Sequence, residues 1–212
     1  MKTVFKRIPI FFILTILMMI VGGVVLFLSS KVGGHLAINA THTPIQDELF
    51  YWITYGGDGL FVVAGIVVLS VLLWRKYKLS IVLLSSLNLI IVGGLVAFLK
   101  HLIYDDAFRP IQFIGRAKLY LVPDSPINLA NSFPSGHTTA AFAFFALVAY
   151  LFPNKWIQSV CVFSATLVGY SRIYLSQHFL EDVVAGAGLG LVCFMLSYWA
   201  VCALPLKSNV AR

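Results

Sequence analysis

Six long apolar runs constrain this chain more than any other feature of its sequence. They cover roughly residues 8–29, 58–74, 79–99, 136–152, 157–171 and 183–204. A helix needs about 20 mostly apolar residues to cross the hydrocarbon core of a bilayer, and about 17–25 is the usual range. We therefore expect an all-α fold, a bundle of six transmembrane helices.

The composition points the same way. Apolar residues make up 60% of the 212 residues and charged residues 11%, against about 45–50% and about 25% in soluble domains. This excludes a soluble enzyme, a disordered chain and a disulfide scaffold. Cys161, Cys193 and Cys202 lie inside apolar runs and are expected to be buried thiols without metal-ligand spacing. No linker divides the chain, so one membrane-embedded domain is expected over residues 1–212.

The basic residues predict the orientation in the membrane. The first apolar run is longer than the core of a secretory signal, so an uncleaved anchor is expected. With the N-terminus in the cytoplasm, the inner segments hold nine basic residues and no acid, and the outer side holds six basic residues and all eight acids. The positive-inside rule favours this arrangement, with both termini cytoplasmic in the plasma (inner) membrane. The net charge of +7 then reflects topology, and no nucleic-acid partner is expected.

Chemistry is expected at the outer face. The connections predicted inside are minimal, whereas the outer segments run over about 31–57, 100–135 and 172–182. All the histidines lie on this outer side. The apolar runs contain no charged residue away from their ends, and transporters usually need such groups near the midplane. This counts against transport.

A helical stripe in the first outer segment predicts an interfacial helix. Ile45, Leu49, Trp52 and Ile53 follow the i, i+4, i+7, i+8 spacing of one helix face. An aromatic-bearing stripe beside a membrane span is typical of a helix lying in the interface. It serves either as an ordinary anchor or as a lip that guides a lipid head group.

Three polar clusters stand at the outer ends of the predicted spans. Each alone has an ordinary explanation, such as a snorkelling lysine, a helix N-cap or a surface His–Asp pair. Because all three lie at about the same depth, six helices could bring them together. The clusters are Lys100 with Arg109-Pro110, then Pro134-Ser135-Gly136-His137, and Ser171-Arg172 with His178 and Asp182.

Together the clusters predict a phosphate site. Lys100, Arg109 and Arg172 can surround a phosphoryl group, and arginine can grip its oxygens bidentately. Ser135 and Gly136 would present backbone amides at a helix N-terminus, where the helix dipole also favours an anion. No metal and no cofactor are expected.

The carboxylate distinguishes the two histidines. Asp182 follows His178 by one helical turn, so it can accept the Nδ1 proton and leave the Nε2 lone pair free as a nucleophile. His137 has no carboxylate at such spacing. It would be held protonated by the phosphate, donate a proton to the leaving oxygen and later activate water.

These blocks resemble the three-part signature of the type-2 phosphatidic acid phosphatase superfamily. The last two blocks match its spacing residue for residue, and the resemblance extends over about residues 58–204. It implies a metal-independent lipid phosphatase with the roles given above. It also implies that His178 forms a phosphohistidine and that Ser135 and Gly136 contact the phosphate.

The first block departs from the family pattern. Eight residues separate Lys100 from Arg109 instead of the usual six. A bulge or an extra part-turn can absorb the two additional residues, because Lys100 ends a predicted helix. The insertion contains Asp105 and Asp106, which we expect to point away from the phosphate.

Several substrates and two other functions remain open. The resemblance allows undecaprenyl pyrophosphate, phosphatidylglycerophosphate, phosphatidate or lipid A phosphates, and an outer site suits undecaprenyl pyrophosphate best. A lipid phosphotransferase would use the same phosphohistidine. A lipid-phosphate binder or transporter is disfavoured, because binding alone needs the cations but neither the histidines nor Asp182. The bilayer is the expected partner, and the sequence leaves the oligomeric state open.

Overall fold

The fold is helical throughout the described residues, as the apolar runs predict. The computed structural model describes residues 2–204, and no strand occurs among them. In chain order the elements are α1 (Lys2–Arg7), α2 (Pro9–Leu28), α3 (Lys31–Asn39), α4 (Pro44–Ile53), η1 (Thr54–Gly57), α5 (Gly59–Tyr77), α6 (Leu79–Phe98), η2 (Leu99–Ile103), α7 (Pro110–Ile114), η3 (Arg116–Lys118), α8 (Gly136–Leu151), α9 (Lys155–Tyr174) and α10 (Leu180–Ala203).

Six long helices follow the six apolar runs closely. Four helical stretches are long and apolar enough to cross a membrane: α2, α5, α6 continued through η2, and α10. The α8 helix is apolar but only 16 residues long. Six crossings therefore remain a prediction, while the all-α class is confirmed.

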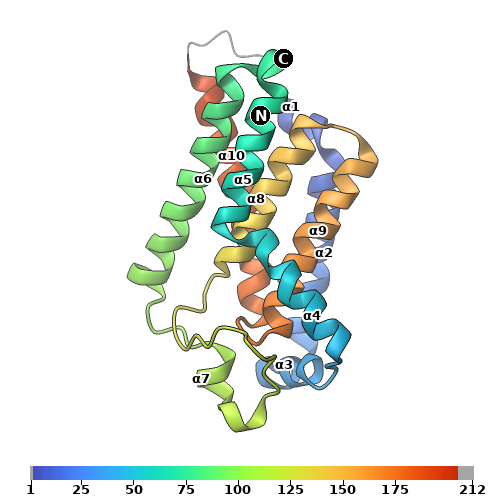
Figure 1. Ribbon diagram of the computed structural model, residues 1–212, viewed down its shortest axis with the longest axis vertical. Helices are drawn as coiled ribbons and strands as arrows, with labels where there is room; N and C mark the ends of the chain where they lie inside the picture. Colours follow the sequence, from blue (N-terminus) through green and yellow to red (C-terminus); the bar gives the residue numbers. More distant parts are fainter. Residues whose placement is uncertain (1, 205–212) are drawn as a thin grey trace.

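The α8 helix lies inside the bundle, packed between α9 and α10 and against α6 (Figure 1). Small residues allow this close approach. A Cβ atom added at Gly190 of α10 would lie 2.6 Å from the carbonyl oxygen of Thr139, and Ala146 and Ala149 of α8 are fully buried. Small residues at helix contacts are the usual solution where lipid supplies no hydrophobic drive between helices.

The outer faces of α2 and α5 are apolar and exposed. Phe27 on α2 is 89% exposed and Val71 on α5 is 71% exposed. A soluble protein rarely leaves so many large apolar side chains in contact with water, so these faces fit the hydrocarbon of a bilayer.

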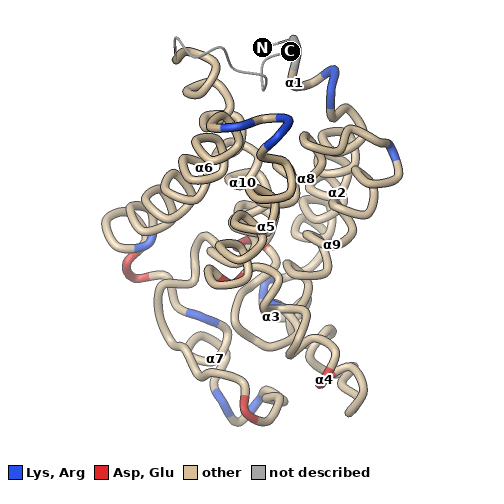
Figure 2. The backbone as a smooth tube through the Cα atoms, turned by 45° about the horizontal axis from the view of Figure 1, so that its top comes forward, with Lys and Arg blue, Asp and Glu red and all other residues tan. Residues whose placement is uncertain are grey.

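The two ends of the bundle differ in charge, as Figure 2 shows. One end holds the short α5–α6 and α8–α9 connections with their lysines and arginines. The other end holds α3, α4, α7 and the long loop before α8, and the acidic residues gather there. The orientation of these ends across a membrane remains a prediction, and Lys207 and Arg212, which contributed to it, lie outside the described residues.

The helix predicted in the first outer segment is present as α4 (Pro44–Ile53), and its position in the membrane interface remains a prediction. Ile45, Leu49 and Trp52 are exposed by 82%, 50% and 61%, so they form the expected apolar stripe. The inclusion of Ile53 in this stripe was wrong, because its side chain turns inward and packs against the buried core.

One thiol also differs from expectation. Cys161 and Cys193 are buried as predicted, but Cys202 is exposed on the last turn of α10. An apolar run in a membrane helix can face outward as well as inward, so the run alone could not decide its burial.

Candidate active site

The structure brings all eight predicted site residues to the end of the bundle that carries α3, α4 and α7. Three of them, Lys100, Arg109 and Arg172, are called the three cations below. All three lie close enough to His178 to repel a proton on its ring. His137, half-buried in the first turn of α8, interacts electrostatically with the three cations and with His178.

The pair of His178 and Asp182 forms as the spacing predicts. His178 Nδ1 lies 3.3 Å from Asp182 Oδ2, and His178 is only 1% exposed. Burial, together with repulsion from the three cations, holds the pKa of His178 well below its usual value. The ring is therefore neutral, with Nδ1 facing the carboxylate and a lone pair available on Nε2.

Asp182 is itself held by two further donors. Its Oδ2 accepts a hydrogen bond of 2.9 Å from the backbone amide of Phe179 and one of 2.5 Å from the hydroxyl of Ser132. Ser132 is 2% exposed, and its Oγ also lies 3.4 Å from His178 Nδ1. The sequence analysis missed Ser132, although it stands three residues before Ser135.

The first turn of α8 is capped by Ser135, as the sequence predicts. Ser135 is the N-cap, and its Oγ accepts from the Thr138 amide at 3.4 Å and from the Thr138 hydroxyl at 2.8 Å. The amides of Gly136 and His137 belong to the first helical turn, where no intrahelical acceptor exists. A Cβ atom at Gly136 would meet only Val96, at 3.4 Å. The amides of this turn are the donors predicted to meet a phosphate.

A π-helical turn carries Lys100, at the start of the longer spacing in the first block. Lys100 lies on η2, and its Nζ donates a hydrogen bond of 2.8 Å to the carbonyl of Asn131 in the loop before α8. A π-turn accommodates an extra residue per turn, and η2 ends the helix at Ile103, so a wider turn stands where a bulge or extra part-turn was expected. Asp105 and Asp106 are exposed, also as expected.

Arg109 is held by neutral acceptors. Its Nε donates to the Ala130 carbonyl at 2.9 Å, and Nη1 donates to the Gln177 carbonyl at 3.1 Å and to the Gln177 amide oxygen at 3.2 Å. Gln177 directly precedes His178, and it also donates to the Pro126 carbonyl at 2.7 Å. The sequence analysis missed Gln177. Through it, Arg109 is hydrogen-bonded to the loop that carries His178, called the histidine loop below.

Arg172 is buried with a single side-chain partner among the described residues. Its Nη1 donates a hydrogen bond of 2.6 Å to Thr54 Oγ1, and its buried Nε has no partner there. Within the described residues none of the three cations forms an ion pair with a carboxylate. No carboxylate therefore neutralises their positive charge, which can attract an anion such as a phosphoryl group.

The described residues contain no group of three or more His, Cys, Asp and Glu side chains that could hold a metal ion.

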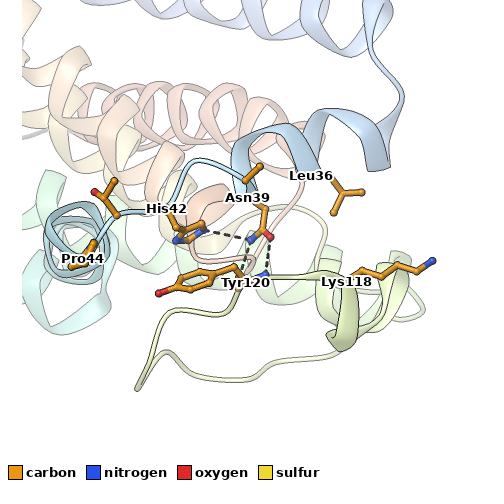
Figure 3. A pocket seen from close by; sticks show the side chains of 8 residues that line it. Leu36, Asn39, His42, Pro44, Lys118 and Tyr120 are labelled. Carbon is orange, nitrogen blue, oxygen red and sulfur yellow. Dashed lines mark hydrogen bonds between the residues drawn. The ribbon is translucent and has the colours of Figure 1, made fainter.

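A separate cavity of about 550 Å³ lies beside this cluster, between α3, the start of α4 and the loop near Tyr120. None of the predicted site residues lines it. Figure 3 shows how Asn39 closes one side of it: Nδ2 donates to the Tyr120 carbonyl and Oδ1 accepts from the Tyr120 amide, both at 2.8 Å. The cavity therefore lies where Asn39 of α3 is hydrogen-bonded to the loop that precedes α8.

Comparisons with known proteins find relatives of this chain. The PAP2 superfamily model matches residues 80–204. The undecaprenyl-diphosphatase of Sulfolobus acidocaldarius is 28% identical over 203 residues, 93% of this chain and 91% of that protein. The lipid A 1-phosphatase of Rhizobium johnstonii is 32% identical over 120 residues, 56% of this chain; the chain spans about half, 48%, of that relative.

A solved structure shares the fold. The crystal structure of Aquifex aeolicus LpxE matches with a TM-score of 0.68 and 26% sequence identity, covering 80% of this chain and 94% of that one. The likeness extends beyond the residues matched by the family model, because 80% of the chain includes part of the first 79 residues.

Proposed function

The chain belongs to the PAP2 superfamily, and from this membership and the geometry of the site we propose that it hydrolyses a membrane lipid phosphate or diphosphate through a phosphohistidine. One observation carries the proposal. His178, oriented by Asp182 on its Nδ1 side, lies among the three cations, none of which is paired with a carboxylate in the described part of the chain. The proposed nucleophile thus lies beside three cations that could bind a phosphoryl group.

The first step is attack on phosphorus. The Nε2 lone pair of His178 forms an N–P bond while the P–O bond to the lipid breaks. His137 donates its proton to the departing oxygen, and the Nδ1 proton of His178 stays directed at Asp182. The three cations and the first-turn amides of α8 stabilise charge on the equatorial oxygens, usually the largest contribution in such reactions.

The second step releases phosphate. His137, now neutral, takes a proton from water as the water oxygen bonds to phosphorus. The N–P bond breaks, inorganic phosphate leaves and His178 returns to its neutral form. Both histidines end as they began, so the cycle needs neither a metal nor a cofactor.

The substrate is proposed to come from the outer leaflet of the plasma membrane. With six crossings and both termini cytoplasmic, the site faces the outside, where undecaprenyl diphosphate is available after cell-wall synthesis. The relative from Sulfolobus acidocaldarius, named undecaprenyl-diphosphatase, aligns with 93% of the chain and supports testing this lipid first. Phosphatidylglycerophosphate, phosphatidate and lipid A phosphates complete the panel.

The test is release of inorganic phosphate by the detergent-purified chain in the presence of EDTA, with each lipid in turn. The His178→Ala variant removes the nucleophile and should leave no measurable turnover. His101→Ala is the matched control, because His101 is exposed on η2 and the mechanism does not use it.

Release by the wild type and by His101→Ala, but not by His178→Ala, supports metal-free histidine catalysis, and the preferred lipid names the substrate. Turnover that persists in His178→Ala, or that requires a divalent metal, contradicts the mechanism. Transfer of labelled phosphate to a lipid acceptor in excess of free phosphate would identify a phosphotransferase instead.

A further inference from the structure

We propose that Thr54 is a positioning residue that aims the Arg172 guanidinium at the phosphoryl group. This inference rests on the proposed function. Thr54 lies on η1, in a part of the chain that the family model, which begins at residue 80, does not match. Its contact with the site comes from the tertiary structure alone.

The contact is short and buried, and its acceptor is neutral. Thr54 Oγ1 accepts a hydrogen bond of 2.6 Å from Arg172 Nη1, and the two residues are 9% and 6% exposed. A hydrogen bond from a charged donor is stronger than one between neutral groups. Because a hydroxyl carries no charge, it can fix the guanidinium without neutralising it. A carboxylate in the same place would compete with the phosphate.

Repulsion makes such a contact necessary. Arg172 lies within electrostatic range of Arg109, and two guanidinium groups repel each other while the site is empty. Apart from Thr54, the Arg172 side chain has no hydrogen-bond partner among the described residues, and its Nε is left without one. Thr54 is therefore the group that keeps Arg172 in place before the phosphate arrives.

Thr54 is itself fixed against both helices that meet at the site. A Cβ atom added at Gly57, three residues later, would lie 2.4 Å from the carbonyl oxygen of His137, so η1 packs directly on the first turn of α8. On the other side, Asp47 of α4 accepts a hydrogen bond of 2.6 Å from the Tyr174 hydroxyl at the end of α9. The hydroxyl of Thr54 is thus held at a defined distance from Arg172.

A merely structural role would give a different result from a positioning role. If Thr54 only satisfies a buried donor, its loss lowers the thermal midpoint of the ligand-free protein. If it orients Arg172, its loss also weakens the binding of phosphate, and a hydroxyl restored by serine recovers that binding.

The experiment measures protection of the full chain in detergent against thermal unfolding by increasing inorganic phosphate. Thr54→Val keeps the shape but removes the hydroxyl, Thr54→Ala is a second hydroxyl-free variant, and Thr54→Ser restores the acceptor. Thr15→Val is the matched control, because Thr15 is fully buried in α2 and its hydroxyl has no partner among the described residues.

We expect the valine and alanine variants to bind phosphate roughly tenfold more weakly or worse, the serine variant to approach the wild type, and Thr15→Val to match it. Equal affinity in Thr54→Val and wild type overturns the inference, as does a serine variant as weak as valine. Wild-type protein that phosphate fails to protect overturns both the inference and the proposed function. Protection without hydrolysis of any lipid overturns only the proposed function.

Discussion

Two regions of this molecule build one site in different ways. Residues 80–204 supply every predicted site residue, in blocks whose spacing is visible in the sequence. The segment from α3 to η1, residues 31–57, supplies none of them. Its Thr54 nevertheless binds Arg172 of the site, and its Asn39 binds the loop near Tyr120, which precedes α8.

This difference distinguishes the residues proposed to react or to bind phosphate from the residues that position them. The groups proposed to react or to bind phosphate need defined types at defined spacing, and these are confined to the second region. The groups that place them need only a donor or acceptor at the right point, which many residue types can supply. We therefore expect substitutions in residues 80–204 to change turnover most, and substitutions in residues 31–57 to change binding and stability.

The largest expected effect tests the His178–Asp182 pair. Asp182→Asn keeps the size of the side chain but removes the charge that fixes the His178 tautomer. Turnover should fall by roughly 10⁴-fold, by analogy with the serine-protease triad, while the thermal midpoint in detergent changes little by comparison. The measurement is kcat for phosphate release.

Glu181→Gln is the matched control for this variant. Glu181 is adjacent in sequence but partly exposed, and it pairs with Lys31 at 2.5 Å on the surface. A surface pair contributes about 1 kcal/mol or less to stability, so kcat should stay near that of the wild type. Near-normal turnover in Asp182→Asn would remove the carboxylate from the mechanism.

A smaller effect is expected from Ser132→Ala. The variant removes the 2.5 Å hydrogen bond to Asp182 Oδ2 and leaves the carboxylate less well oriented. We expect kcat to fall about 10- to 100-fold, in line with the loss of one hydrogen bond to a charged group. Affinity for inorganic phosphate should be kept, because Ser132 contacts none of the three cations in the described structure.

Ser125→Ala provides the comparison on the same loop, since the Ser125 hydroxyl is buried without a partner among the described residues. It should leave kcat unchanged. A fall in phosphate affinity rather than kcat in Ser132→Ala would show that Ser132 acts on the phosphate site and not on the nucleophile.

The smallest effect tests the first region through its stability at acid pH. His35 on α3 is 3% exposed, with Nε2 3.2 Å from Ser176 Oγ on the histidine loop. Burial lowers the pKa of His35 to about 4, against an opposing effect of Asp182. Between pH 6.5 and about 4 the unfolded chain therefore binds more protons, and stability falls as the pH falls.

At pH 5 this cost is about 2 kcal/mol, or roughly 4–8 °C in thermal midpoint for a chain of this size. His35→Gln cannot titrate, so its midpoint should drop less than that of the wild type between pH 7 and pH 5. His101→Gln, an exposed histidine, should follow the wild type. Equal losses of thermal midpoint in His35→Gln and in the wild type would show that folding does not lower the pKa of His35.

How much of the site could be predicted from the sequence also differs between residues 80–204 and residues 31–57. The His178–Asp182 contact could be predicted because i, i+4 spacing on one turn fixes it locally. The role of Ser132 had a partial signal in its place beside Ser135. Gln177 likewise had a partial signal, because it directly precedes His178. Thr54 had none, because it lies 118 positions before Arg172 in the sequence and the two share no local pattern.

The sequence by itself determined the helical class, the apolar runs and which residues are proposed to carry chemistry, because hydropathy and helical spacing act over a few turns. It also fixed the charge difference between the two ends of the bundle. The tertiary structure alone decided which neutral groups hold each cation, that the π-helical turn η2 carries Lys100, and that Ile53 turns inward. These depend on contacts between distant segments, which form only when the helices pack.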